Sequence, residues 1–78
     1  MKPIITEKAV MMIESNNVLT FSDALKKTKE EMKKEVEEMF SVKVKKVRSL
    51  IKNNQKYFYV QLNKEFPAID VASKIGVM

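Results

Sequence analysis

The chain has 78 residues, with fifteen lysines and arginines against ten acidic residues and with no cysteine and no histidine. A chain of this length predicts one small domain, residues 1–78, with a single core. Without cysteine there are no disulfides or thiolate metal sites, and without histidine the commonest catalytic base is missing, so we expect no catalytic residues, no metal and no cofactor. The first twenty residues hold no apolar run long enough for a signal peptide or a membrane span, and we expect a cytoplasmic protein.

The N-terminal half of the chain predicts a helix, a strand and a second helix. The first helix should begin at Thr6 and run to about Ser15, where a pair of asparagines stops it. Residues 18–21 form a strand, which we expect to end early because Ser22 and Asp23 follow.

The second helix has the clearest start signal in the chain. Thr28 is its N-cap, and Glu31 completes a capping box for a helix over 29–40. Its apolar residues recur at helical spacing and predict one buried stripe: Met32, Val36, Met39 and Phe40. Acids and lysines interleave on the other faces, which predicts ion pairs and no metal cluster.

The C-terminal half predicts a β-hairpin and a short helix. Residues 42–51 are strand-like, but their alternation slips near Lys45-Lys46, which indicates a bulge. A turn at 53–55 leads into a strand over 57–62. Pro67 opens the last helix, and its packing positions are Ala68, Val71, Ala72 and Ile75, with Gly76 just past the end. The order helix, strand, helix, strand, strand, helix predicts an α+β fold in which a small antiparallel or mixed sheet packs against helices.

The excess charge lies in one stretch, residues 43–56, which contains no acid. Its cations are Lys43, Lys45, Lys46, Arg48, Lys52 and Lys56, while the rest of the chain is nearly neutral. Spread along two paired strands, these charges would follow a phosphate backbone, and a localised basic patch indicates a polyanion partner. Tyr57 and Tyr59 follow this stretch directly. Their rings could stack on RNA bases, or they could simply pack in the sheet. Stacking is favoured more for Tyr57 than for Tyr59.

The first helix carries Met11 and Met12 side by side. Neighbouring helical residues cannot both face inward, so one of these methionines is a candidate for an exposed docking patch.

Runs of residues along the whole chain resemble, in order, the universal large-subunit ribosomal protein L twenty-three family in its archaeal form. They are Ile4-Ile5-Thr6-Glu7-Lys8-Ala9, Asn17-Val18-Leu19-Thr20-Phe21, Thr28-Lys29, Val36-Glu37-Glu38-Met39-Phe40-Ser41-Val42-Lys43-Val44, Lys46-Val47, Tyr59-Val60-Gln61-Leu62 and Asp70-Val71-Ala72-Ser73-Lys74-Ile75-Gly76. The resemblance implies a ferredoxin-like α/β plait that binds large-subunit ribosomal RNA beside the exit of the polypeptide tunnel. It also implies ribosomal protein L twenty-nine and the signal recognition particle as partners, with no membrane and no small-molecule substrate.

The basic stretch and the resemblance together indicate the candidate site residues, and the resemblance adds Lys29 and the start of the first helix. The candidates for RNA binding are Lys29, Lys43, Lys45, Lys46, Arg48, Ser49, Lys52, Lys56 and Tyr57, and those for protein docking are Thr6, Glu7 and Lys8. Glu7 has an equally good structural interpretation, as an acid favoured by the helix dipole. The run Val47-Arg48-Ser49 departs from the Val-Asn-Thr that is common in the family, so an arginine replaces an asparagine contact there.

Two other functions remain open at this point. One is a stand-alone basic module that binds any nucleic acid alike, and the other is a protein-interaction adaptor whose basic face meets an acidic partner.

Overall fold

The computed structural model describes residues 2–4 and 6–75. The described elements are β1 (Lys2–Pro3), α1 (Glu7–Asn16), β2 (Val18–Asp23), α2 (Lys29–Phe40), β3 (Val44–Lys52), β4 (Gln55–Leu62) and α3 (Ala68–Lys74). The predicted α+β class and element order are confirmed, with one strand added. That strand, β1, spans two residues and leaves no periodic pattern in the sequence; it exists because it pairs with β2.

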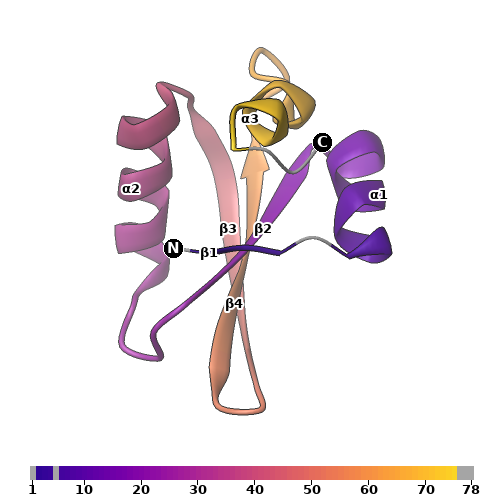
Figure 1. Ribbon diagram of the computed structural model, residues 1–78. Coiled ribbons are helices and arrows are strands. Elements are labelled where there is room, and N and C mark those ends of the chain that lie inside the picture. Colours follow the sequence, from indigo (N-terminus) through magenta and orange to yellow (C-terminus); the bar gives the residue numbers. More distant parts are fainter. Residues whose placement is uncertain (1, 5, 76–78) are drawn as a thin grey trace.

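The sheet is antiparallel at every pairing of the described strands, in the order β1-β2-β4-β3 (Figure 1). Strand β4 lies between β2 and β3, which therefore run parallel to each other and are joined through α2. This is the split β-α-β arrangement of a ferredoxin-like plait. Here the N-terminal β1 supplies one outer strand, and α1 is an additional helix.

Local sequence signals determine both long helices. The Thr6 hydroxyl accepts a hydrogen bond from the Ala9 N–H at 3.1 Å, which caps α1, and Asn17 ends that helix in the left-handed conformation at φ 57°. At α2 the Thr28 hydroxyl accepts from the Glu31 N–H, and the Glu31 carboxylate accepts from the Thr28 N–H, both at 3.1 Å. The predicted bounds of α2 are confirmed at both ends.

The hairpin contains the expected bulge. The register between β3 and β4 shifts between Val44 and Lys46. The turn is shorter than predicted: Asn53 and Asn54 both have positive φ, at 53° and 61°, which suits a two-residue turn, and Gln55 already begins β4. The distal half of the hairpin extends beyond all three helices in Figure 1.

The expected early end of β2 was wrong. The strand continues through Ser22 to Asp23, which lies opposite Lys56. Backbone pairing with the long strand β4 holds these two polar residues in the sheet, although their side chains contribute little to the core.

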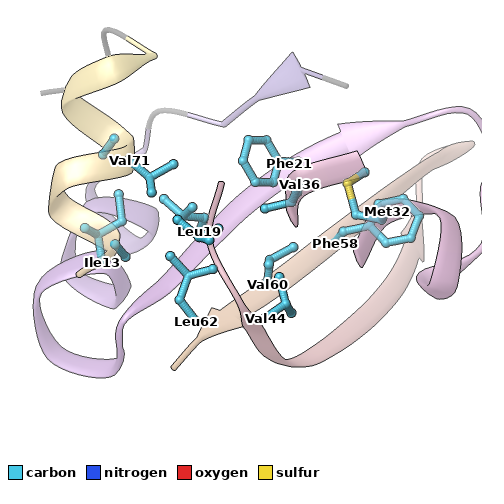
Figure 2. Packing of buried hydrophobic residues seen from close by; sticks show 13 residues of the cluster. Ile13, Leu19, Phe21, Met32, Val36, Val44, Phe58, Val60, Leu62 and Val71 are labelled. Atoms are coloured by element: carbon cyan, nitrogen blue, oxygen red, sulfur yellow. The ribbon is translucent and has the colours of Figure 1, made fainter. Parts of the chain in front are cut away.

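The core lies between the sheet and the helices (Figure 2). Helix α2 packs on β3 and β4, α3 packs on β2 and α1, and α1 packs on β2. The buried residues of the core are Ile13, Leu19, Phe21, Met32, Val36, Val42, Val44, Phe58, Val60, Leu62, Ala68, Val71 and Ala72. The predicted packing residues of α3 are confirmed: Ala68, Val71 and Ala72 belong to the core, and Ile75 is half-buried against it. The predicted Gly76 lies outside the described residues.

The prediction for Met39 was wrong, because its side chain is 57% exposed. The last turn of α2 contacts the core through Phe40 instead. Among the described residues, no helix has the length and apolar character needed to cross a membrane.

Candidate nucleic-acid interface

The two faces of the sheet have different chemistry. Phe58, Val60 and Leu62 of β4 point to the core, so the intervening residues of β4 lie on the opposite side, which we call the outer face. Residues that pair directly share a face. The register pairs Lys46, Arg48, Leu50 and Lys52 with Gln61, Tyr59, Tyr57 and Gln55, in that order. Three cations of the predicted ladder therefore lie together on the outer face.

The bulge adds a fourth cation to this group. Lys45 is the extra residue between Val44 and Lys46, and both lysines are exposed. The backbone there is held by helix α2, because the Glu37 carboxylate accepts a hydrogen bond from the Val44 N–H at 3.0 Å. A bulge bends its strand and re-aims the side chains beside it. Here it brings two consecutive lysines to the same region.

A concavity of about 790 Å³ lies between α1 and the outer face of the hairpin. Five cations line it, contributed by α1, the hairpin and the segment after β4: Lys8, Lys45, Lys46, Arg48 and Lys64. Glu14 is the one acid among the lining residues. Tyr59 and Gln61 contribute from β4, and Met12 and Val18 add apolar surface.

The charge of these five cations is not neutralised by neighbours. The ion pairs of the described residues join Lys27 to Asp23 at 3.5 Å and to Glu35, and they involve no cation of the concavity. The hydrogen bond to Glu35 raises the pKa of Lys27. Of the acids of α2, Glu35 is thus engaged with Lys27, near the turn between β2 and α2, and none of these ion pairs reduces the positive potential of the outer face.

Lys56 is separated from the outer face. It lies opposite Ile51 on the side of the sheet that carries the core, its Nζ donates to the Lys27 carbonyl oxygen at 2.7 Å, and the same Nζ lies 5.4 Å from the centre of the Phe58 ring. Lys29, exposed at the first turn of α2, is two residues from that carbonyl. The structure therefore places Lys29 and Lys56 apart from the cations of the concavity.

The other candidate residues of the hairpin are Lys43, Lys52, Tyr57 and Ser49. Lys43 is exposed just before β3, and its carbonyl oxygen accepts from the Asn63 N–H at 3.1 Å. Lys52 is exposed beside the turn, and the Tyr57 hydroxyl donates to Gln55 Oε1 at 2.8 Å. Ser49 pairs with Phe58 and so belongs to the side of the sheet that carries the core, but it is exposed because the hairpin there extends beyond the helices, and it is among the residues that line the concavity.

The docking candidates lie at the start of α1. Thr6 is the cap, Glu7 is exposed in the first turn, and Lys8 also lines the concavity. Of the two methionines, Met11 is 58% exposed and Met12 is half-buried. The exposed docking candidate is thus Met11, on the helix that carries Glu7.

Sequence reasoning missed Lys64, Met12 and Gln61 as parts of this site. The concavity is formed by residues of α1, of the hairpin and of the segment after β4, and nothing in the order of residues signals that these parts face one another. Among the described residues, no group of three or more acidic side chains is placed to hold a metal ion.

Comparisons with known proteins confirm the resemblance. The chain matches the family described as Ribosomal protein L23 over residues 1–69. It is 45% identical over 75 residues to the large ribosomal subunit protein uL23 of Picrophilus torridus, covering 96% of this chain and 92% of that protein. It is 42% identical over 78 residues to the uL23 protein of Methanothermobacter thermautotrophicus, covering 99% of this chain and 91% of that protein. The chain therefore belongs to the ribosomal protein L23 family.

Proposed function

We propose that this chain binds large-subunit ribosomal RNA beside the exit of the polypeptide tunnel, with the outer face of β3 and β4 against the RNA. Membership in a family of ribosomal proteins makes it a structural protein of the cytoplasmic ribosome and not an enzyme. One observation carries the proposal: Lys45, Lys46 and Arg48 are exposed around one concavity and have no carboxylate partner in the described residues.

Phosphate contacts would supply most of the affinity. Each lysine or arginine that neutralises a phosphate releases condensed counterions, which favours binding and makes it depend on salt. The bulge and the concavity would give the surface a shape that fits one folded RNA better than others. Lys43, Lys52 and Tyr57 would extend this surface along the hairpin, and Ser49 would contribute from the lining of the concavity. Lys29 and Lys56 would contact a separate RNA segment, near the start of α2.

The test is binding of the purified protein to the tunnel-exit domain of large-subunit ribosomal RNA across a salt series. An unrelated structured RNA of the same length serves as the comparison. We expect selective binding to the ribosomal fragment, and we expect the triple change Lys45→Gln, Lys46→Gln, Arg48→Gln to weaken it at least about tenfold at 0.1 M salt and to lower the log–log salt slope by about two to three.

A matched control removes the same charge elsewhere. Lys26, Lys33 and Lys34 are exposed, and changing all three to Gln also lowers the net charge by three. This control should change the salt slope by less than one. Equal binding to both RNAs would favour a general nucleic-acid module, and no binding to either would favour an adaptor for an acidic protein.

We further propose that Thr6, Glu7 and Lys8, with the exposed Met11, form a protein-docking surface for the signal recognition particle, and that ribosomal protein L twenty-nine is a neighbour. The exposed acid and methionine on one helix support this. Ribosomes that carry Glu7→Lys should bind the particle more weakly than wild-type ribosomes, whereas Glu38→Lys, an exposed change on α2, should have no effect. Equal binding by both variants would exclude Glu7 from the docking surface.

A further inference from the structure

We propose that the concavity between α1 and the hairpin accepts one unpaired nucleotide of the bound RNA, with its base against Tyr59 and its flanking phosphates at Lys46 and Arg48. This inference rests on the proposed RNA-binding function and goes further, because it assigns a ligand and a stacking residue to one place on the molecule.

The size of the concavity suits a single nucleotide. Its volume of about 790 Å³ lies in the range of roughly 300–1,000 Å³ that is usual for sites that enclose small organic ligands. A paired RNA helix presents phosphates on a convex surface and keeps its bases stacked inside, so it would lie across the opening without filling it. Only a base that has left the stack can enter.

The lining has the mixed chemistry that a nucleotide needs. Tyr59 supplies an aromatic ring on a sheet, which is how several RNA-binding folds stack unpaired bases. The amide of Gln61 can both donate to and accept from a base edge, and Met12 and Val18 offer apolar contact. A merely solvated basic face would need neither the ring nor the apolar wall.

Two of the cations lie directly beside the candidates for base contact. Arg48 pairs directly with Tyr59, and Lys46 pairs with Gln61, so each base-contacting candidate has a cation on the adjacent strand. Adjacent strands are about 5 Å apart, which is the scale of the distance from a base to its own phosphate chain. One nucleotide can therefore contact both strands at once.

The position of Tyr59 distinguishes it from Tyr57. Tyr59 lines the concavity and is flanked in the sheet by Thr20 of β2 and Arg48 of β3, which makes it part of a rigid platform. Tyr57 is not among the lining residues, and its hydroxyl is bound to Gln55 near the turn. The sequence favours Tyr57 for stacking, whereas the geometry points to Tyr59.

The experiment uses base-specific chemical probing of the tunnel-exit ribosomal RNA domain, free and bound to the full chain. We expect at least one unpaired base to be reactive in the free RNA, protected by the wild-type protein, and reactive again in the complex with Tyr59→Leu. That variant should bind about tenfold more weakly with an unchanged salt slope, because stacking is lost and the phosphate contacts remain.

Two further variants separate stacking from general damage to the sheet. Tyr59→Phe keeps the ring and should protect the same base, and Ile51→Ala, an exposed change of the hairpin outside the concavity, should protect it too. Protection that is identical for wild type and Tyr59→Leu, or the loss of protection at every site with Tyr59→Leu, would overturn the nucleotide site. In the first case RNA binding itself still stands; failure of the wild-type protein to bind the fragment at all would overturn both proposals.

Discussion

Asn17 is the residue on which most of the tertiary structure converges. Its Nδ2 donates to the carbonyl oxygens of Leu62 and Asn63 at 3.2 Å and of Phe66 at 3.1 Å, and its Oδ1 accepts from the Ala68 N–H. Pro67, at the N-cap position of α3, makes no side-chain cap, so Asn17 caps that helix from 51 positions away along the chain. One residue therefore ends α1 with its backbone, and with its side chain it caps α3 and closes the segment between β4 and α3.

Replacing Asn17 should destabilise the protein more than any other change of a polar residue in α1 or just after it. We expect Asn17→Ala to lower the free energy of unfolding by about 2–4 kcal/mol, because several half-buried backbone groups lose their partner and because alanine tolerates the left-handed conformation less well than asparagine does. Asn17→Gly keeps the backbone conformation and should recover only part of the loss.

Urea denaturation measures these differences, with Asn16→Ala as the control. Asn16 is exposed, and its replacement should change the stability by less than about 0.5 kcal/mol. If Asn17→Ala and Asn16→Ala unfold at the same urea concentration, the side chain of Asn17 does not hold these segments together.

At the same scale, one of the two roles of Asn17 could be predicted from the sequence. Two asparagines after a helical pattern predict a stop, because asparagine tolerates the left-handed conformation. The tertiary bonds could not be predicted, since they connect Asn17 to positions 45 to 51 residues away, and no local pattern encodes such contacts.

At the scale of elements, α2 was the most predictable part of the chain. Its capping box consists of two reciprocal bonds between Thr28 and Glu31, three residues apart, so the whole signal lies within one turn. The bulge of β3 was predictable as well, since it shifts the alternation of side chains. The concavity between α1 and the hairpin was not predictable, because it depends on how separate elements are placed in the fold.

The capping box predicts a specific response to acid. The hydrogen bond from the Thr28 N–H lowers the pKa of Glu31 below its usual value of 4.5. A carboxyl whose pKa is lower in the folded state stabilises the protein above the unfolded pKa, and that stabilisation disappears as the pH falls through the folded pKa. We expect the contribution of Glu31 to be present at pH 6 and to be lost below about pH 4.5.

The comparison that isolates this effect is wild type against Glu31→Gln. Glutamine can accept the same hydrogen bond but does not titrate. Wild type should have the higher free energy of unfolding at pH 6, and its difference from Glu31→Gln should shrink toward pH 3. The control is Glu30→Gln, which removes an exposed acid with no capping bond. Its difference from wild type should change less over the same range. A gap for Glu31→Gln that stays constant across this range would contradict the prediction.

At the scale of the whole molecule, the fold keeps its two charge populations apart. Six cations and no acid lie within residues 43–56. The acids of α2 are on a helix packed against the other side of the sheet, and two of the described carboxylates are paired with Lys27. The sequence alone revealed the excess of charge in the hairpin, whereas the register was needed to learn that Lys46, Arg48 and Lys52 share a face.

This separation should cost stability in the absence of RNA. Like charges on one surface repel, and salt screens them: the Debye length falls from about 30 Å at 0.01 M to about 10 Å at 0.1 M. We therefore expect the melting temperature of the free protein to rise between these salt concentrations by several degrees, since about 1 kcal/mol corresponds to about 4–8 °C in a domain of this size.

The variants designed for the RNA experiment test the cause of this rise. The triple change Lys45→Gln, Lys46→Gln, Arg48→Gln should raise the melting temperature at 0.01 M salt and flatten its salt dependence. The control at Lys26, Lys33 and Lys34 removes lysines that alternate with acids on and beside α2, so it should not stabilise the protein. Two results would show that the hairpin cations do not repel one another appreciably. One is a melting temperature of the wild-type protein that stays constant or falls as salt is added. The other is a triple variant that is no more stable than the control. If the expected result is obtained, the substitutions that stabilise the free protein are also the ones that weaken its binding to RNA. The reason is that the same positive charge binds phosphate in the complex and destabilises the fold when no RNA is bound.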